Sequence, residues 1–576
     1  MFKTLLKSVR EYKKDSLLSP LFMIGEVAME VLIPLFMANL INNGINTGNM
    51  QYIINIGILL TVLCIISLTC GMLSGKFAAS AASGFSKNLR KDMYYNIQKF
   101  SFSNIDKFST ASIVTRLTTD VVNVQNAYQM LIRVAVRSPI MLISAFFMSF
   151  YLNPKLAVIF LLAVIILAIG LYLIMTKAYP IFQRVFKRYD KLNNVVQENL
   201  HGIRVVKSYV REDFEKNKFN EASTNIYKDF IKTEKLVALM NPLMNFTMNF
   251  SIILLAWFSA KFIIKGNMET GDLMTLITYS GQILMSLMML SMILAMLIMA
   301  KASAERIVEI LEEKTDLENN DEPKKDVLKG DISFENVSFS YTKDKEKCCL
   351  ININLDIKEG ETVGIIGGTG SSKTTLVQLI PRLYDVLEGR ILVSGEDVRN
   401  YDLEELRNSV AMVLQKNVLF SGTIKENLRW GNENASDEEL ERVCKLACAH
   451  DFIKEFKDKY DTYIEQGGTN VSGGQKQRLC IARALLKKPK ILILDDSTSA
   501  VDTKTDASIR EALKTEIPNT TKIIIAQRIS SIQHADKIVV LNEGEIDAIG
   551  NHDELLKNND IYREIYELQL KGGIEE

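Results

Sequence analysis

A glycine-rich segment at residues 367–374 carries the residue types that bind a nucleotide phosphate. It reads Gly-Gly-Thr-Gly-Ser-Ser-Lys-Thr and lies between an expected strand at 362–366 and an expected helix that begins at Lys373. In such a strand–loop–helix, backbone N–H groups surround the phosphates, the lysine reaches the terminal ones, and the next hydroxyl binds Mg²⁺. The segment predicts a site for ATP and Mg²⁺. Its expected phosphate-binding residues are Gly367, Gly368, Thr369, Gly370, Ser371, Ser372, Lys373, Thr374 and Thr375.

Two further segments distinguish this site from an unrelated glycine-rich turn. Asp495 ends the strongly apolar run 491–495, which is where nucleoside triphosphatases carry a magnesium-binding carboxylate. Upstream, residues 471–475 read Val-Ser-Gly-Gly-Gln. The phosphate loop, the acidic strand end and this third motif together indicate one composite ATP site.

These motifs resemble those of the ABC transporter family, of the exporter type, and the resemblance extends over essentially the whole chain. In that family each ATP site combines the phosphate loop of one chain with the signature motif of the other. The resemblance implies that Tyr341 stacks on adenine and that Asp502 belongs to a loop crossing the dimer interface. It implies Thr374, Gln415 and Asp495 around Mg²⁺. The signature residues would be Val471, Ser472, Gly473, Gly474 and Gln475.

The sequence departs from the family pattern at the residues that hydrolyse ATP. Asp496 stands where a glutamate is usual, and it is one methylene too short to reach the attacking water as a general base. Gln527 stands at the switch position in place of histidine and cannot carry a proton. Ser372 replaces the glycine before the lysine. The sequence therefore predicts that this chain's own ATP site is degenerate. Because the signature is intact, it also predicts an unlike partner chain whose ATP site this signature completes.

Composition narrows the remaining function classes. Lys and Arg together number 68, as do Asp and Glu, so the net charge does not indicate a nucleic-acid-binding protein.

Cys444, Cys448 and His450 form only a weak metal-ligand set, and packed, reduced thiols are the favoured interpretation. The basic N-terminal segment leads into an apolar run too long for a signal-peptide core, so a retained membrane span is expected.

Long apolar runs are confined to the first half of the chain, and each is long enough to cross a bilayer. The charged stretches 78–131 and 177–241 are rich in Lys and Arg and are expected as helical excursions into the cytoplasm. From Ile332 the pattern changes to short β runs alternating with helices. The expected spans are 17–41, 53–77, 132–152, 155–176, 242–264 and 272–299.

This pattern predicts a fold class and a domain division. An all-α six-helix transmembrane domain at 1–305 is expected to precede a linker at 306–330. An α/β nucleotide-binding domain of ABC type with a mostly parallel sheet is expected at 331–576.

Polar groups inside the spans suggest a cargo cavity. Glu26 and Glu30 lie one turn apart in the first span, with no Lys or Arg expected at comparable depth. They are interpreted either as a protonated structural pair or as a site for cationic amphiphiles. Methionines and asparagines on the fifth and sixth spans either pack against lipid and neighbouring helices or line the cavity. The candidate cavity residues are Glu26, Glu30, Asn245, Asn249, Met285, Met289 and Met292.

The altered ATP site beside an intact signature resembles the degenerate-site half of heterodimeric bacterial multidrug ABC exporters. This resemblance implies one half of a heterodimeric exporter of amphiphilic or drug-like small molecules in a bacterial plasma membrane. Its expected partners are an unlike half-transporter chain, the lipid bilayer and a small-molecule cargo. A lipid or peptide exporter and an exporter-fold importer remain alternatives. So does a membrane subunit that senses ATP without transporting.

Overall fold

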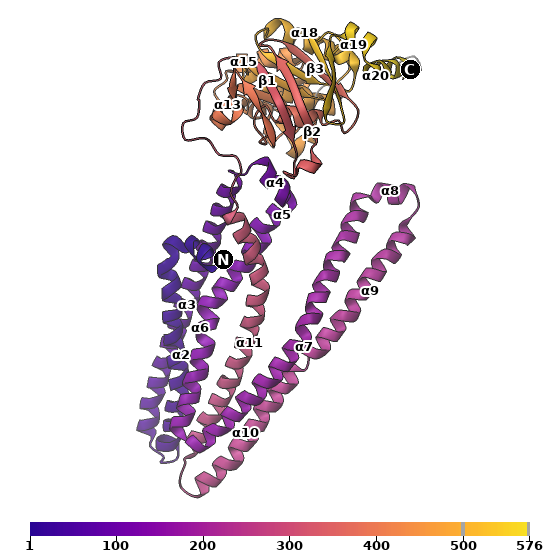
Figure 1. Cartoon of the computed structure of the whole chain (residues 1–576). Helices are drawn as coiled ribbons and strands as arrows, with labels where there is room; N and C mark the ends of the chain where they lie inside the picture. Colours follow the sequence, from indigo (N-terminus) through magenta and orange to yellow (C-terminus); the bar gives the residue numbers. More distant parts are fainter. Residues whose placement is uncertain (497–500, 573–576) are drawn as a thin grey trace. The chain divides into compact units, whose positions relative to one another are not determined.

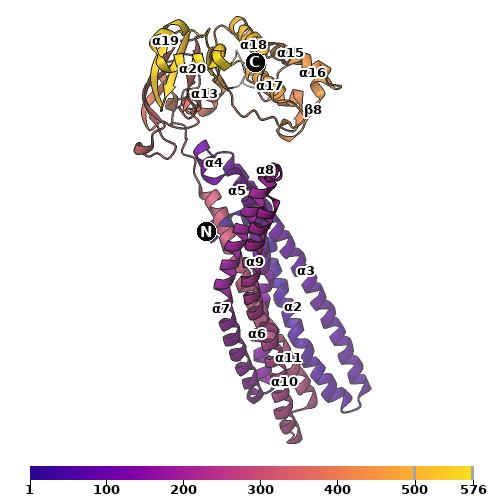
Figure 2. The ribbon, with the colours of Figure 1, turned by 90° about the vertical axis from the view of Figure 1, so that its right-hand side faces the viewer.

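The computed structural model describes residues 1–496 and 501–572. The chain divides into two compact units. The membrane unit comprises Met1–Gln98 and Thr110–Glu313, and the nucleotide unit comprises Lys99–Ser109 and Lys314–Glu576. Figures 1 and 2 show the helical and the sheet-containing part.

Six helical segments in the described residues are long and apolar enough to span a membrane. Each overlaps one of the six expected spans, which confirms the predicted six-helix membrane fold. The helices that carry the spans are α2 (Lys13–Leu40, continued to Ile45), α3 (Met50–Ile97), α6 (Val121–Leu152), α7 (Pro154–His201), α10 (Met240–Ile264) and α11 (Thr270–Glu312). The helix α11 enters the region expected as a linker before it ends at Glu312.

The junction between α6 and α7 shows how the sequence sets a helix boundary. Asn153 Oδ1 accepts hydrogen bonds from the backbone N–H groups of Lys155 and Leu156, at 3.1 and 3.3 Å. Pro154 occupies the first turn of α7, where a missing N–H costs nothing. One capping residue and one proline therefore end one long helix and begin the next.

The membrane unit consists of a packed bundle and a long hairpin. The bundle contains α2, α3, α6 and α11, which lie together in both views (Figures 1 and 2). Its buried core includes Val27, Met141 and Tyr279. The Tyr279 hydroxyl donates to the carbonyl of Val31 at 2.7 Å, which satisfies the polar end of a buried ring. The hairpin pairs α7 with α9 (Glu212–Val237), and α8 (Ile203–Ser208) forms its tip (Figure 1).

The nucleotide unit is built on two main sheets among the described residues. The larger has the order β12-β11-β3-β10-β9-β6, parallel throughout except for β12 at its edge, as expected for an α/β domain. Its strands are β3 (Thr362–Gly367), β6 (Val410–Val413), β9 (Ile491–Asp495), β10 (Thr521–Ile525), β11 (Lys537–Asn542) and β12 (Glu545–Gly550).

A smaller antiparallel sheet has the order β2-β1-β4-β5. Its strands are β1 (Ile332–Phe339), β2 (Leu350–Ile357), β4 (Glu388–Val393) and β5 (Glu396–Asp397). The strand β2 was not predicted. It reads LININLDI, and its asparagines and aspartate weaken the usual strand composition.

The register of the parallel sheet brings the candidate residues to one edge. Ile525 of β10 lies opposite Ile365 of β3 on one side and Asp495 of β9 on the other. The carboxyl ends of these strands therefore lie side by side, and ligands bind at such an edge in open α/β sheets. The phosphate loop, Asp495, Asp496 and the segment after β10 all emerge there.

Candidate ATP site

The phosphate loop connects β3 to the short helix α12 (Lys373–Gln378). The Lys373 ammonium donates to the carbonyls of Gly367 and Gly368, at 2.9 and 2.8 Å. Burial lowers the pKa of Lys373, and the nearby carboxylates of Asp495 and Asp496 oppose that shift. A partly buried cation at the loop is suited to bind phosphate oxygens that replace these carbonyl contacts.

Ser372 has a backbone conformation that a serine adopts at a cost. Its φ of 65° lies in the left-handed region, where glycine is unstrained. A non-glycine residue in this region costs about 1–2 kcal/mol. This conformation explains why glycine is the usual residue before the loop lysine.

The two residues expected at the metal lie against each other. The Thr374 hydroxyl is 3.0 and 2.9 Å from the two carboxylate oxygens of Asp495. Burial raises the pKa of Asp495, and the Thr374 hydrogen bond opposes that rise. A hydroxyl and a carboxylate beside the phosphate loop are the oxygen ligands that Mg²⁺ prefers. When bound, Mg²⁺ would neutralise charge on the ATP phosphates.

The Asp496 side chain is held by two amides. Gln527 Nε2 donates to Asp496 Oδ2 at 2.7 Å, and Gln415 Nε2 lies 3.3 Å from the same oxygen. The backbone of Asp496 has φ 48°, also in the left-handed region. The structure therefore joins the two positions that depart from the family pattern, together with the expected Mg²⁺-sensing glutamine. Neither amide can accept the proton that a general base must remove.

A residue that the sequence did not suggest fixes the switch segment. Gln569 lies on the C-terminal helix α20 (Asp560–Gly572). Its side chain donates to the backbone carbonyl of Gln527 at 2.8 Å and accepts from the backbone N–H of Ile529 at 2.9 Å. No motif marks Gln569, because the contact depends on where α20 packs.

Tyr341 lies at the edge of the site and is half exposed. Its hydroxyl is 2.9 Å from the Thr375 hydroxyl of α12, so the ring is fixed relative to the phosphate loop. Tyr384 packs edge-on against Tyr341 with 5.2 Å between ring centroids. The exposed ring remains the expected adenine platform.

Tyr384 also connects the site to the helix α4 (Phe102–Phe108), which belongs to the nucleotide unit. Its hydroxyl donates to Asp106 Oδ2 at 2.8 Å, and its ring lies 6.0 Å from that of Phe102. Burial and the Asp106 carboxylate raise the pKa of Tyr384, so the phenol stays protonated and can donate. Sequence reasoning missed this link, because Tyr384 belongs to no motif.

The signature residues begin the helix α17 (Gly473–Leu486). Ser472 caps this helix: its hydroxyl accepts from the Gln475 N–H at 3.3 Å, and the Gln475 side chain accepts from the Ser472 N–H at 2.9 Å. Both donors of a capping box are satisfied. The other signature residues, Val471, Gly473 and Gly474, adjoin this cap.

Asp502 caps the next helix, α18 (Thr503–Glu516), through a 2.9 Å hydrogen bond from the Thr505 N–H to its carboxylate. That backbone bond lowers the pKa of Asp502. Ser499 and Ala500, which complete the expected interface loop, lie outside the described residues.

Comparison with known proteins agrees with this geometry. The family description "ABC transporter transmembrane region" matches residues 16–287, and "ABC transporter" matches residues 350–499. A Bacillus subtilis protein described as an uncharacterized ABC transporter ATP-binding protein, YfiB, is 38% identical over 98% of each chain. The chain belongs to the ABC transporter family. The transporter is a multi-pass membrane protein with a cytoplasmic, C-terminal nucleotide-binding domain.

Two further similarities are to a lipid A-core flippase and to a solved exporter structure. The ATP-dependent lipid A-core flippase of Desulfotalea psychrophila is 34% identical over 79% of the transporter and 80% of its own length. The solved structure of a bacterial Atm1-family ABC exporter with ATP bound has a TM-score of 0.83 at 24% identity. It covers 97% of the transporter and 99% of that chain. This second match supports the exporter fold.

Within the membrane unit, a cavity of about 620 Å³ lies among α2, α6 and α11. Glu30, Met285 and Met289 line it, as the sequence suggested. Met292 lies outside the lining and is 59% exposed. Asn245 and Asn249 are also outside it, on α10, where the Asn249 amide donates to the Asn245 carbonyl at 2.9 Å.

The expectation that Glu26 and Glu30 have no basic partner was wrong. Arg137 of α6 donates to Glu26 Oε1 at 3.1 Å and to both Glu30 oxygens, at 2.7 and 2.8 Å. Arg137 lies near the start of the expected span 132–152, but α6 begins at Val121, so the hydropathy pattern misjudged the depth of Arg137 relative to the two glutamates. The two carboxylates share one guanidinium, so this pair is not the unpartnered acidic site that the sequence suggested.

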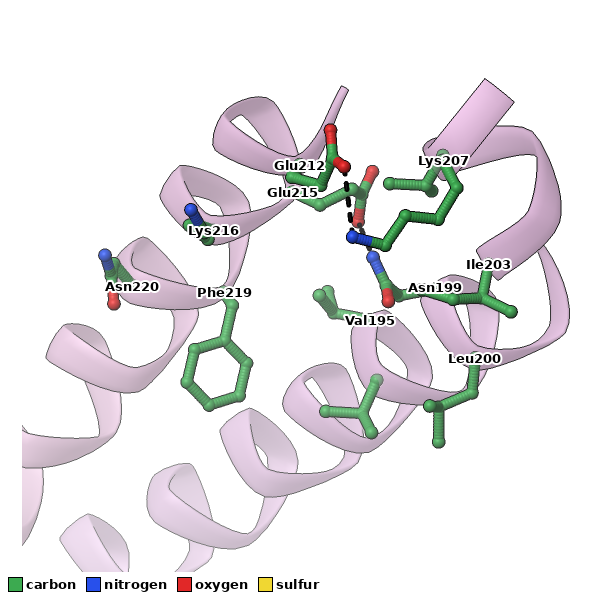
Figure 3. Close-up of a pocket in the computed structure, with 12 residues that line it drawn as sticks. Val195, Asn199, Leu200, Ile203, Lys207, Glu212, Glu215, Lys216, Phe219 and Asn220 are labelled. Atoms are coloured by element: carbon green, nitrogen blue, oxygen red, sulfur yellow. Dashed lines mark hydrogen bonds and ion pairs between the residues drawn. The ribbon is translucent and has the colours of Figure 1, made fainter. Parts of the chain in front are cut away.

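A second cavity, of about 500 Å³, lies between α7, α8 and α9 (Figure 3). Apolar side chains such as Val195 and Phe219 line it, and so do Lys207 and Glu212, which form an ion pair of 3.0 Å. Leu200, also in the lining, is 66% accessible, and Tyr209 and Val210 at the hairpin tip are 74% and 80% accessible. An exposed apolar surface of this kind is typical of a protein interface.

The described residues contain no cluster of three or more potential metal-ligating side chains of the His, Cys, Asp and Glu types. Cys444 is buried, and burial raises its thiol pKa to about 12. His450 Nδ1 is hydrogen-bonded to the Tyr460 hydroxyl at 3.0 Å.

Proposed function

We propose that the transporter is one half of a heterodimeric exporter whose own ATP site binds ATP without efficient hydrolysis. The observation that carries this proposal is the Gln527–Asp496 hydrogen bond of 2.7 Å. The residue in the place of the general base is short and is engaged by an amide. The residue in the place of the switch histidine cannot transfer a proton.

The intact signature supports an unlike partner. In a homodimer both ATP sites would contain Asp496 and Gln527, and both would hydrolyse slowly. With a partner that carries glutamate and histidine, Ser472 and its capping box would complete one competent site. The exposed apolar tip of the α7–α9 hairpin offers an additional surface that an assembled transporter would cover.

Amphiphilic or drug-like molecules are the proposed cargo. The cavity among α2, α6 and α11 has a size typical of small-molecule sites, about 300–1,000 Å³, and methionines form part of its wall. The similarity to the lipid A-core flippase favours a lipid as the second candidate cargo. An importer or a peptide exporter of the same fold has no specific observation in its favour.

The test of this proposal is the ATPase activity of the purified full chain, alone and after co-purification with the unlike half-transporter chain. We expect magnesium-dependent turnover at least about 10-fold higher for the pair, because only the pair contains a competent base. A lone chain that hydrolyses ATP as fast as the pair would refute it. Cargo movement by the pair in vesicles distinguishes transport from a subunit that only senses ATP.

A further inference from the structure

The cavity among α2, α6 and α11 contains a second arginine that forms no ion pair with the Glu26–Glu30–Arg137 cluster. Arg133 lines it, one helical turn before Arg137 on α6. Among the side chains that the structure describes, none forms a hydrogen bond or ion pair with the Arg133 guanidinium. Its five N–H donors are therefore available to a ligand.

Arg133 is held inside the protein. Its guanidinium lies over Gly75 of α3: a Cβ at that glycine would be 3.7–3.8 Å from Cζ and both terminal nitrogens. The side chain is partly buried and lines the cavity among α2, α6 and α11. An arginine that only extends toward lipid headgroups would not pack its guanidinium against a neighbouring helix in this way.

The same cavity contains an acceptor without a partner. Gln282 of α11 lines it, and its Oε1 atom is buried with no hydrogen bond. Its amide nitrogen is oriented by the Glu30 backbone carbonyl, at 3.3 Å. A buried acceptor left unpaired costs free energy, and a ligand that donates a hydroxyl hydrogen would remove that cost.

The remaining wall is apolar. Met23, Ile33 and Pro34 come from α2, and Met285 and Met289 come from α11. Methionine side chains adapt to acyl chains and rings of different shapes. The cavity therefore offers a cation, a hydroxyl acceptor and an adaptable apolar surface within one space.

We propose that this cavity binds an amphiphile with an anionic headgroup, with the anion at Arg133 and a headgroup hydroxyl at Gln282. The proposal rests on the proposed transport function and names its cargo class. Arg133 lies near the start of the expected span 132–152, at the cytoplasmic side, so the ligand enters from the inner leaflet or the cytoplasm. Two sources have this chemistry: a phospholipid such as phosphatidylglycerol, and a soluble anionic amphiphile.

Binding to the full chain in a non-ionic detergent tests the proposal without any ATPase measurement. The probes are a fluorescent short-chain phosphatidylglycerol, the matching phosphatidylcholine, and anilinonaphthalene sulfonate as the soluble anion. We expect Arg133→Gln to weaken binding of at least one anionic probe about 10-fold or more, because a charge-assisted contact is lost. Arg133→Lys should retain most of the affinity, and phosphatidylcholine should bind weakly to every variant.

Lys76→Gln is the matched control, because Lys76 is an exposed cation beside Gly75 on α3 and lies outside the cavity lining. Its anion affinity should equal that of the parent. Met285→Trp keeps the Arg133 charge and fills the cavity, so it should also weaken anion binding. It is the substitute test if Arg133→Gln does not fold. Arg133-dependent binding of the lipid alone, or of the sulfonate alone, identifies the source.

Unchanged anion binding in a folded Arg133→Gln overturns the proposal, as does equal loss in Lys76→Gln. If Arg133→Gln does not fold, unchanged anion binding in Met285→Trp overturns it. Failure of the heterodimer proposal would appear as fast ATP hydrolysis by the lone chain, which this titration does not measure. The two outcomes are therefore distinguishable.

Discussion

The Gln527 side-chain amide donates a hydrogen bond to the Asp496 carboxylate, with 2.7 Å between Nε2 and Oδ2. This contact joins two positions that lie on different strand ends and that each depart from the pattern of an active ATP site. Because the two side chains are in contact, we expect that restoring glutamate at 496 or histidine at 527 alone does not restore ATP hydrolysis.

Restoring one of these positions is expected to change little. In the lone chain, Asp496→Glu lengthens the acid but leaves an amide at Gln527 to hold it, and Gln527→His leaves the acid short. We expect each single variant to stay within about 3-fold of the parent ATPase rate and the double variant to exceed the product of the two effects, because residues in contact are non-additive. Steady-state phosphate release measures this. Strictly multiplicative effects would show that the two positions act separately.

Removing the signature hydroxyl is expected to damage the partner's site. In the assembled pair, Ser472→Ala should lower ATP turnover about 10-fold or more and leave nucleotide affinity at this chain's own phosphate loop unchanged. Ser436→Ala is the matched control, since Ser436 has the same capping-box role on α15 (Asp437–Leu446). If Ser436→Ala lowered turnover equally, the Ser472 effect would be explained by the loss of a helix cap and not by a role in the partner's ATP site.

The Tyr384–Asp106 hydrogen bond is expected to couple cargo binding in the membrane domain to ATP hydrolysis in the nucleotide-binding domain. Tyr384→Phe removes the donor to Asp106 but keeps the ring against Tyr341 and Phe102. Losing this hydrogen bond removes about 1 kcal/mol of stabilisation. The variant should show weaker stimulation of ATPase activity by cargo and an unchanged affinity for ATP. Tyr463→Phe, at an exposed ring in the same unit, is the control. Loss of ATP binding in Tyr384→Phe would instead assign it to the nucleotide site.

Gln569 is expected to hold the switch segment. In Gln569→Ala, the Ile529 N–H loses its acceptor and the Gln527 carbonyl loses its donor. Hydrogen exchange at Ile529 should accelerate about 5-fold for a loss of about 1 kcal/mol. Gln569→Glu keeps the acceptor and should protect Ile529 better than alanine does. Glu567→Ala, an exposed neighbour, should leave exchange unchanged. Identical exchange in all variants would mean that α20 does not restrain this segment.

The sequence was informative where a motif fixes both the residue and its element. The structure brings Lys373, Thr374 and Asp495 together, because strand–loop–helix geometry and parallel register leave little freedom. Their roles toward ATP and Mg²⁺ stay predictions. The membrane spans were predicted because a bilayer demands long apolar helices.

Contacts that depend on helix rotation or on packing between distant segments were not predictable. Arg137 was overlooked as the partner of Glu26 and Glu30 because hydropathy does not fix the relative depth of residues on two different helices. Tyr384 and Gln569 have no sequence signal, since their partners are brought close only by the folded domain. The strand β2 was missed although its apolar and polar residues alternate, because asparagine and aspartate are uncommon inside strands.

The most direct measurement of the central claim is the chemical identity of the nucleotide at each phosphate loop during turnover. The assembled pair would be photolabelled with radioactive 8-azido-ATP under turnover, and the nucleotide attached to each chain would be separated as ATP or ADP. The account predicts mainly ATP on this chain, because Asp496 and Gln527 do not support hydrolysis, and mainly ADP on its partner. Equal proportions of ADP on both chains would contradict it.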